Sequence, residues 1–249
     1  MLIDAHIHLE QYKDEEIPSL LDEVDAVIAV SMELSSCQRT HQLAKMYSKV
    51  KAAFGFHPEQ PVLSQMDEDA LFKWIRRYQD HMVAVGEVGL PYYLRQEQAI
   101  DNAPYIALLE RFIVLAKELR KPIILHAVYE DAMIACDLLE KHQVQRAHFH
   151  WFKGDQAVVQ RLIQHGYAIS ITPDCLYEEE IQQLIQAYPI ELMMVETDGP
   201  WPFEGPFAGK RTAPWMMHST IRMIAAIKGI TAQEAAYILM QNTKNFYQL

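Results

Sequence analysis

Two histidines one residue apart, His6 and His8, stand near the start of the chain in the run MLIDAHIHLE. Asp4 precedes them at the same spacing of two, so on a β-strand all three side chains point to one face. The pair is either two surface histidines on a terminal strand or half of a metal site, because neutral imidazole is a frequent metal ligand. The remaining polar residues of the chain distinguish these interpretations.

More imidazoles and carboxylates end apolar runs further along the chain. Glu87 ends MVAVGE, His126 ends KPIILH and His150 ends RAHFH, while Asp198 follows LMMVET, two residues after Glu196. Each residue alone has an ordinary explanation, such as a hydrogen-bonded histidine, a helix cap or a turn. Four imidazoles and two carboxylates at the same ends of several strands instead predict one metal site, since burying them without a metal is costly.

The elements that must position these residues alternate along the chain. Short β-type runs are predicted at 2–7, 26–30, 51–56, 82–88, 121–127, 146–150, 167–171 and 191–197. Stretches such as 67–78, 105–119 and 157–166 have apolar residues at three- and four-residue spacing, which predicts helices. This pattern predicts an α/β fold, a (β/α)8 TIM barrel made by residues 1–249 as a single domain. A doubly wound open sheet is the competitor, but AHIHLEQY lacks the Gly-rich turn that usually follows its first strand.

Composition limits the classes of function. Half of the 249 residues are apolar and 22% are charged, as in ordinary globular proteins. The formal net charge of −11 argues against broad attraction to nucleic acid, so a nucleic-acid substrate would have to be held locally. Three scattered cysteines, the lack of a signal peptide and the lack of a long apolar run predict a cytoplasmic protein that does not enter membranes. No obligate protein partner is predicted.

The number of ligands predicts more than one ion. Six ligands are too many for one tetrahedral ion and enough for two ions with a shared bridge, for which the two oxygens of Glu87 are suited. Mixed nitrogen and oxygen ligands favour zinc, manganese, iron or nickel over calcium or magnesium. The predicted cofactor is two divalent ions, with zinc, manganese, nickel and also magnesium as candidates. Two such ions beside two carboxylates leave local positive charge, which favours an anion such as phosphate.

The same motifs resemble a known family. DAHIHL at 4–9 resembles the opening motif of the TatD family of metal-dependent hydrolases, which are amidohydrolase-like TIM barrels. GFHPE, AVGEVGL, KPIILHA, HWFKG and VETDGPW follow in the family's order and cover nearly the whole chain. The resemblance implies a TIM barrel with one to three metals and hydrolase activity. Family members are described as deoxyribonucleases, including 3′→5′ exonucleases.

The resemblance also implies metal ligands. His6 and His8 match the ligands of one metal, and His126 and His150 match those of a second. Glu87 matches the carboxylate that bridges the two metals and is a predicted catalytic residue.

Further roles follow from the same resemblance. Asp198 matches the aspartate that binds metal and serves as general base for the attacking water, so it is the second predicted catalytic residue. Asp4 and Glu196 are interpreted as groups that orient the ligands. His57 is predicted either to face the scissile phosphate or to make a structural hydrogen bond.

Departures from the family pattern concern the substrate rather than the metals. Pro91 replaces a common aspartate, and AVYED lacks an arginine that usually follows the fifth-strand histidine. Trp151 and Lys153 replace small residues, and Thr212 stands near an expected asparagine. Phosphate-contacting groups of the family are therefore missing.

Two sets of residues are candidates to replace the missing substrate contacts. Lys153 and Arg211, with Lys210, are either new phosphate ligands or solvated surface charges. Four aromatic residues of the late Pro/Gly-rich segment either stack on bases or plug the barrel mouth: Trp201, Phe203, Phe207 and Trp215.

The predicted function is metal-dependent hydrolysis, with DNA or a small phosphoester as substrate and metal-activated water as nucleophile. One alternative is hydrolysis of a small ester, lactone or amide on the same barrel, which the acidic charge and the missing arginine favour. The other is a metal-binding barrel without catalysis, which gives no role to a base such as Asp198 beside an open coordination position.

Overall fold

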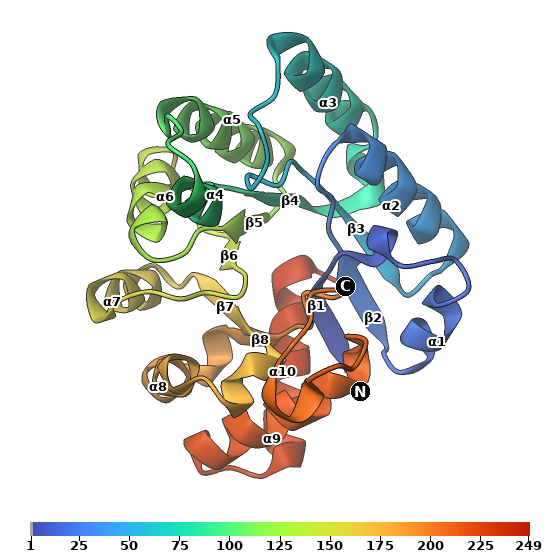
Figure 1. The fold of residues 1–249 in the computed structure, drawn as a ribbon, viewed down its shortest axis with the longest axis vertical. Coiled ribbons are helices and arrows are strands. Elements are labelled where there is room, and N and C mark those ends of the chain that lie inside the picture. The colour runs from blue at the N-terminus through green and yellow to red at the C-terminus, as the bar shows by residue number, and fades with distance from the viewer. Residues whose placement is uncertain (1) are drawn as a thin grey trace.

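The computed structural model describes residues 2–249 and contains one sheet of eight parallel strands in chain order (Figure 1). The strands are β1 (Ile3–Ile7), β2 (Ala26–Ala29), β3 (Val50–Phe54), β4 (Met82–Gly89), β5 (Ile123–His126), β6 (Ala147–Phe149), β7 (Ala168–Ile171) and β8 (Met193–Val195). Each lies within or largely overlaps a run that the sequence pattern predicts as a strand. Backbone N–H groups of His8 and Asp198 donate across the seam to Gly199 and His6, so the segments that follow β8 and end β1 are joined. The predicted TIM barrel is confirmed.

Helices surround the strands (Figure 1). They are α1 (Ile17–Asp22), α2 (Leu34–Met46), α3 (Gln65–Arg77), α4 (Tyr92–Glu97), α5 (Ala103–Leu119), α6 (Glu130–Lys141), α7 (Gln156–His165), α8 (Glu179–Ala187), α9 (Met217–Lys228) and α10 (Ala232–Tyr247). Short 3-10 helices span Leu9–Gln11, Gln79–His81, Pro173–Leu176, Ile190–Leu192, Gly205–Phe207 and Pro214–Met216.

Local sequence sets several helix ends. Ser64 and Asp155 accept hydrogen bonds from backbone N–H groups in the first turns of α3 and α7, as N-caps do. Gly166 ends α7 in the left-handed conformation, as its position after an amphipathic run predicts. Thr231 and Glu234 form a reciprocal capping box at the start of α10.

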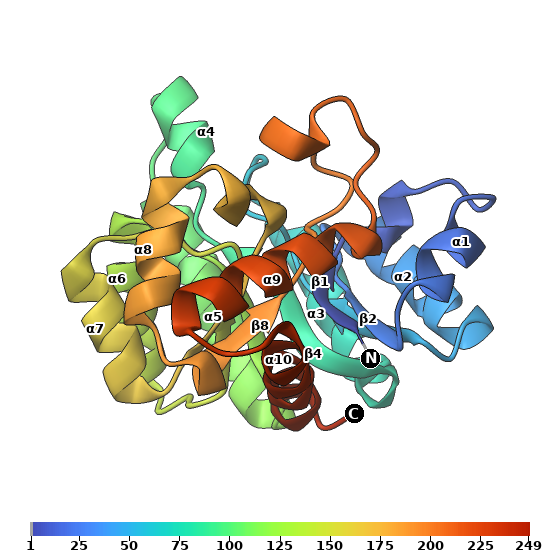
Figure 2. The same cartoon turned by 90° about the horizontal axis from the view of Figure 1, so that it is seen from below.

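One end of the barrel is closed by apolar packing and the other carries the polar residues. Small and medium apolar side chains, including Ala53, Ala84 and Met194, form a cluster that Tyr247 of α10 joins. Figure 2 shows α10 and both termini at one end of the molecule, with α4 and the segment after β8 projecting at the other. The carboxyl ends of the strands lead to that second end, where TIM barrels place their reactive groups. No helix in residues 2–249 is both long and apolar enough to span a bilayer.

Candidate metal centre

Glu87 lies at the centre of the predicted ligand set and presents one oxygen to each of two histidine pairs. Its Oε2 lies 3.1 Å from Nε2 of His6 and 3.2 Å from Nε2 of His8. Its Oε1 lies 3.0 Å from Nδ1 of His126 and 2.6 Å from Nε2 of His150. All five side chains are buried. This is the arrangement that a carboxylate bridging two ions requires.

Asp198 completes the first of these two groups. Its Oδ1 lies 3.3 Å from Nε2 of His6 and 3.4 Å from Nε2 of His8. Asp198 has a positive φ of 49°, which an aspartate tolerates better than most residues, and its N–H donates to the carbonyl of His6. A Cβ on the next residue, Gly199, would lie 2.1 Å from the hydroxyl of Tyr12, so only glycine fits there.

Asp4 holds the two sides of this seam together. Its Oδ1 accepts the backbone N–H groups of Thr197 and His6, at 3.0 Å and 3.2 Å. The Thr197 hydroxyl donates to Oδ2 at 2.5 Å. Burial raises the pKa of Asp4 to about 7. Its bonds keep His6 beside the segment that carries Asp198, which agrees with an orienting role.

The residues present fit divalent ions. Both ring nitrogens of His6, Oε2 of Glu87 and Oδ1 of Asp198 are buried and have no hydrogen-bond partner among the described residues. Buried polar atoms are normally paired, so the convergence of these unpaired atoms fits a site that holds a cation. The candidate metal groups of residues 2–249 all lie here, in combinations of His6, His8, His57, Glu87, His126, His150 and Glu196.

The electrostatics of the cluster also favour positive charge. Burial by itself lowers the pKa of His150, but the carboxylates of Glu87 and Glu196 raise it well above its ordinary value. His8 behaves in the same way, because Asp198, Glu10 and Glu87 outweigh its burial. Burial raises the pKa of Glu87, but His150 and the other imidazoles hold it well below its usual range. A divalent ion bound here would supply the positive charge that these groups favour, in place of their protons.

Three histidines that face Glu87 contact a second carboxylate through their other ring nitrogen. Nε2 of His126 lies 3.0 Å from Glu59, Nδ1 of His150 lies 3.6 Å from Glu196, and Nδ1 of His8 lies 3.5 Å from Glu10. In each case the other ring nitrogen faces Glu87. A proton held on the carboxylate side leaves the lone pair of the facing nitrogen free for a metal, an arrangement common among metal-binding histidines.

Two of these three carboxylates were not predicted. Glu59 ends GFHPE and Glu10 follows DAHIHL, so both lie in or next to motifs whose histidines are the predicted site residues. Glu59 also accepts the backbone N–H groups of Tyr93 and Leu94, at 2.9 Å and 2.6 Å, and so anchors the start of α4. The contact of Glu59 with His126 joins segments far apart in the chain, so no sequence signal identifies it. The contact of Glu10 with His8 is local, and its spacing of two residues is visible in the sequence.

His57 lines the cavity beside Glu87 and has a defined tautomer. Its Nδ1 accepts the backbone N–H of Glu59 at 3.2 Å, so the ring proton is on Nε2, which lies 3.5 Å from Oε1 of Glu87. Burial lowers the pKa of His57 to about 3, which keeps the ring neutral. His57 therefore makes a structural hydrogen bond and also presents an N–H donor toward the site. Its predicted contact with a phosphate stays a prediction.

A buried chain of hydrogen bonds supports Glu196 from the opposite end of the barrel. The hydroxyl of Ser170 donates to Glu196 and lies 2.6 Å from Nε2 of His148. Nδ1 of His148 lies 2.7 Å from the hydroxyl of Tyr247 on α10. Since Ser170 uses its proton on Glu196, His148 must donate from Nε2 and accept from Tyr247 at Nδ1. Burial holds the pKa of His148 well below its ordinary value, which agrees with this neutral tautomer.

Lys153 and Arg211 lie away from the cluster. Lys153 Nζ lies 3.8 Å from Oδ2 of Asp174 and over the ring of Trp151. Arg211 pairs with Glu16 at 3.1 Å and lies over the Tyr12 ring. Neither cation is among the described residues that line the cavity above the cluster. Their predicted substrate contacts stay predictions.

That cavity has a volume of about 420 Å³, within the range of small-ligand sites. Its lining comprises His57, Glu59, Tyr93, Glu97, His126, Val128, His150, Trp151, Asp198 and Trp201. Phe203 and Phe207 are instead buried with Met216 in a separate cluster, against which Trp215 packs. The interpretation as a hydrophobic plug thus fits these aromatics, whereas Trp201 is exposed at the cavity.

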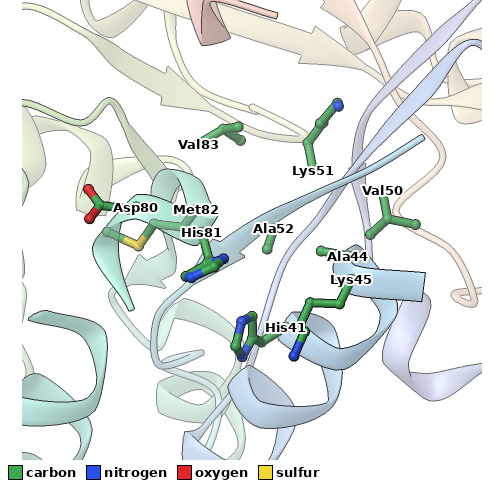
Figure 3. Close-up of a pocket in the computed structure, with 10 residues that line it drawn as sticks. All are labelled: His41, Ala44, Lys45, Val50, Lys51, Ala52, Asp80, His81, Met82 and Val83. Atoms are coloured by element: carbon green, nitrogen blue, oxygen red, sulfur yellow. The ribbon is translucent and has the colours of Figure 1, made fainter. Parts of the chain in front are cut away.

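A second pocket lies apart from the candidate metal centre, between α2, β3 and the start of β4 (Figure 3). The rings of His41 and His81 lie 4.9 Å apart in it, with Lys45, Lys51 and Asp80 also in its lining. None of the candidate metal groups in residues 2–249 includes these residues. This pocket therefore adds nothing to the candidate metal centre.

Known proteins resemble this chain along its whole length. A relative from Haemophilus influenzae named as an uncharacterized metal-dependent hydrolase is 39% identical, with 100% of both chains covered. Human deoxyribonuclease TATDN3 is 28% identical, with 99% of this chain and 94% of its own covered. The crystal structure of YJJV, a TatD homolog from Escherichia coli, shares the fold with a TM-score of 0.86 at 24% identity, covering 100% of this chain and 98% of its own.

The family described as TatD related DNase matches residues 3–248. This match spans all eight strands and every residue of the candidate metal centre. The chain therefore belongs to the TatD family of metal-dependent hydrolases.

Proposed function

We propose that this protein is a deoxyribonuclease that hydrolyses phosphodiester bonds at a two-metal centre. The observation that carries the proposal is the position of Glu87, whose two oxygens face two separate histidine pairs. His6, His8 and Asp198 would hold one ion, and His126 and His150 would hold the other. The relative named deoxyribonuclease TATDN3 supports DNA as the substrate.

When bound by these residues, the two ions would supply Lewis acidity, which stabilises charge on phosphoryl oxygens and lowers the pKa of water. Asp198 is the residue that takes a proton from the attacking water. Burial raises the pKa of Asp198, but the adjacent imidazoles of His6 and His8 outweigh this and hold it well below its ordinary value, so the carboxylate is ionised. We expect His57 to donate its Nε2–H to a phosphoryl oxygen, which the tautomer set by the Glu59 N–H allows.

The proposal includes two divalent ions per chain, with zinc, manganese, magnesium and nickel as the candidates. A single domain spanning residues 1–249 and a cytoplasmic location are further expectations.

A second candidate is hydrolysis of a small ester, lactone or amide. Five carboxylates surround the imidazoles, namely Glu10, Glu59, Glu87, Glu196 and Asp198. Their combined formal charge exceeds the charge of two divalent ions, whereas the sequence-based charge count included only Glu87 and Asp198. The excess of positive charge predicted for phosphate binding is therefore absent, and this observation favours a less anionic substrate.

Release of mononucleotides from single-stranded DNA tests the first proposal. The assay uses purified protein with magnesium, manganese or zinc, beside Asp198→Asn as control for contaminating nuclease. Metal-dependent release that the variant lacks supports the deoxyribonuclease. Turnover of p-nitrophenyl acetate or a lactone, with no release from DNA and no competition by an oligonucleotide, supports the second candidate. Unfolding of the protein by a chelator, without hydrolysis of any of these substrates by the metal-loaded form, supports a purely structural site.

A further inference from the structure

Tyr93 and Trp201 line the cavity from two different segments above the barrel. Tyr93 belongs to α4, and Trp201 follows Asp198 in the long segment after β8. Figure 2 shows both segments rising beyond the strands on the same side, with a separation between them. The side chains are 47% and 49% exposed, although large aromatic rings usually bury most of their area. Two exposed aromatic faces at one cavity indicate a ligand with flat surfaces.

Both residues are tied to the candidate metal centre through their backbones. The N–H of Tyr93 donates to Glu59, the carboxylate that also contacts His126. The N–H of Trp201 donates to the carbonyl of Asp198 at 3.2 Å. The backbone of each residue therefore has a defined position relative to a candidate metal ligand, and the Tyr93 ring also meets the His126 ring at 6.1 Å.

Neighbouring side chains support this placement. The Thr212 hydroxyl donates to the carbonyl of Trp201, and the Tyr12 hydroxyl donates to the carbonyl of Thr212 at 2.8 Å. The ring of Tyr93 meets the ring of Tyr92 at 5.3 Å in a T-shaped contact. Burial and Glu59 raise the pKa of Tyr93 to about 12, so its phenol stays neutral at physiological pH.

Charge does not explain how a nucleic acid would be held here. No lysine or arginine is among the described residues that line the cavity, and Glu59 and Glu97 add negative charge to its wall. Proteins that bind strands through the backbone use a positively charged groove, which this cavity lacks. Stacking of bases on aromatic rings requires no cation and tolerates any base, because every base has a π-face.

We propose that Tyr93 and Trp201 are paired stacking platforms that grip the bases flanking the scissile phosphate. This inference rests on the proposed action on DNA and assigns the specificity of the same site. The metal centre engages one phosphate and the two rings engage the adjacent bases. Binding then requires unstacked bases, and the affinity depends only weakly on salt concentration.

The test measures binding separately from cleavage. Fluorescence anisotropy follows a labelled single-stranded oligonucleotide, and a matched one with tetrahydrofuran abasic units in place of nucleosides, on metal-loaded Asp198→Asn protein. We expect the base-bearing strand to bind more tightly. Tyr93→Leu and Trp201→Leu should each weaken its binding about 5- to 150-fold, the range found for aromatic rings that stack on bases. The abasic strand should be unaffected.

Conservative and remote variants complete the design. Tyr93→Phe and Trp201→Phe keep a ring and should keep most of the affinity, whereas Tyr237→Leu, at an exposed position on α10, should change nothing. The logarithm of the dissociation constant should rise with the logarithm of salt by less than about one, since few phosphates are neutralised.

The outcomes separate this inference from the proposed function. Three results would overturn the stacking platforms. They are equal affinity for the two strands, no binding of either strand, and leucine variants that lose the same affinity for both strands. Suppose that the protein binds the base-bearing strand more tightly and that the leucine variants lose this preference, but that the protein cleaves no DNA. The stacking platforms are then supported and the deoxyribonuclease is refuted. If the protein cleaves DNA and neither leucine variant changes binding of the base-bearing strand, the deoxyribonuclease is supported and the stacking platforms are refuted.

Discussion

Nε2 of His126 lies 3.0 Å from the Glu59 carboxylate, so this candidate metal ligand donates its distal proton away from the cluster. Burial raises the pKa of Glu59, but its bonds with His126 and the start of α4 lower it below its ordinary value. Glu59 is therefore an ionised acceptor that sets the tautomer of His126 and leaves Nδ1 directed at Glu87.

Replacing Glu59 by glutamine should weaken binding of the ion at His126 and His150 by about 10- to 100-fold, because the amide is a poorer acceptor for the imidazole proton. Competition with a chelator measures this affinity, and circular dichroism reports the fold. Glu118→Gln, a change in an exposed ion pair, is the matched control. An unchanged affinity in Glu59→Gln would remove Glu59 from the metal centre.

The proposal that Glu87 bridges two ions predicts a difference in metal content between two variants. Glu87→Gln should lose affinity at both ions, because each of its oxygens faces a different histidine pair. His126→Ala should lose about one equivalent and keep the other. Metal analysis after gel filtration gives the ratio. If both variants lose the same single equivalent, Glu87 does not bridge.

Asp198→Asn should keep the fold and much of the metal while lowering turnover by about 10²- to 10⁴-fold, the contribution expected of a general base. The amide preserves the shape and the oxygen near His6 and His8 but cannot accept the proton of water. Steady-state kinetics and metal analysis on the same preparation check this. Near wild-type turnover would contradict the assignment.

Ser170→Ala should disturb the metal centre from inside the barrel. The change leaves Nε2 of His148 without an acceptor and removes a donor from Glu196, which should cost about 1–3 kcal/mol of unfolding free energy. Weaker metal binding should accompany this loss, since Glu196 faces His150. Chemical denaturation and chelator competition measure the two effects. Ser35→Ala, at an exposed position on α2, should produce neither.

His41 should make stability depend on acidity. Burial, followed by the charges of His81 and Lys45, lowers the pKa of His41 below its ordinary value of 6.5. His41 therefore takes up a proton more readily in the unfolded chain than in the folded one. The stabilising contribution of neutral His41 is present above pH 6.5 and is lost as the pH falls below that value. His41→Phe keeps an aromatic ring and should make the decline between pH 7.5 and 5.5 shallower. Urea denaturation at both pH values checks this, with exposed His218→Phe as control. An unchanged slope in His41→Phe would contradict the prediction.

The alternation of apolar runs with amphipathic stretches was enough to predict the barrel. Burial on both faces of a parallel strand demands continuous apolar residues, and that demand is visible in short windows of sequence. His6, His126 and Asp198 could be placed at one end for the same reason, since each stands at the end or just beyond such a run. The sequence by itself therefore determined which candidate metal ligands meet, although not that Glu59 joins them.

Only the tertiary structure decided how those side chains are used. The nitrogens that His126 and His150 present depend on Glu59 and Glu196, which lie in other segments of the chain. The exposure of Trp201 depends on the path of a long loop, which side-chain and backbone contacts set and no periodicity encodes. Strand ends are local properties of the chain, whereas tautomers, ion pairs and loop paths arise from contacts between residues distant in sequence.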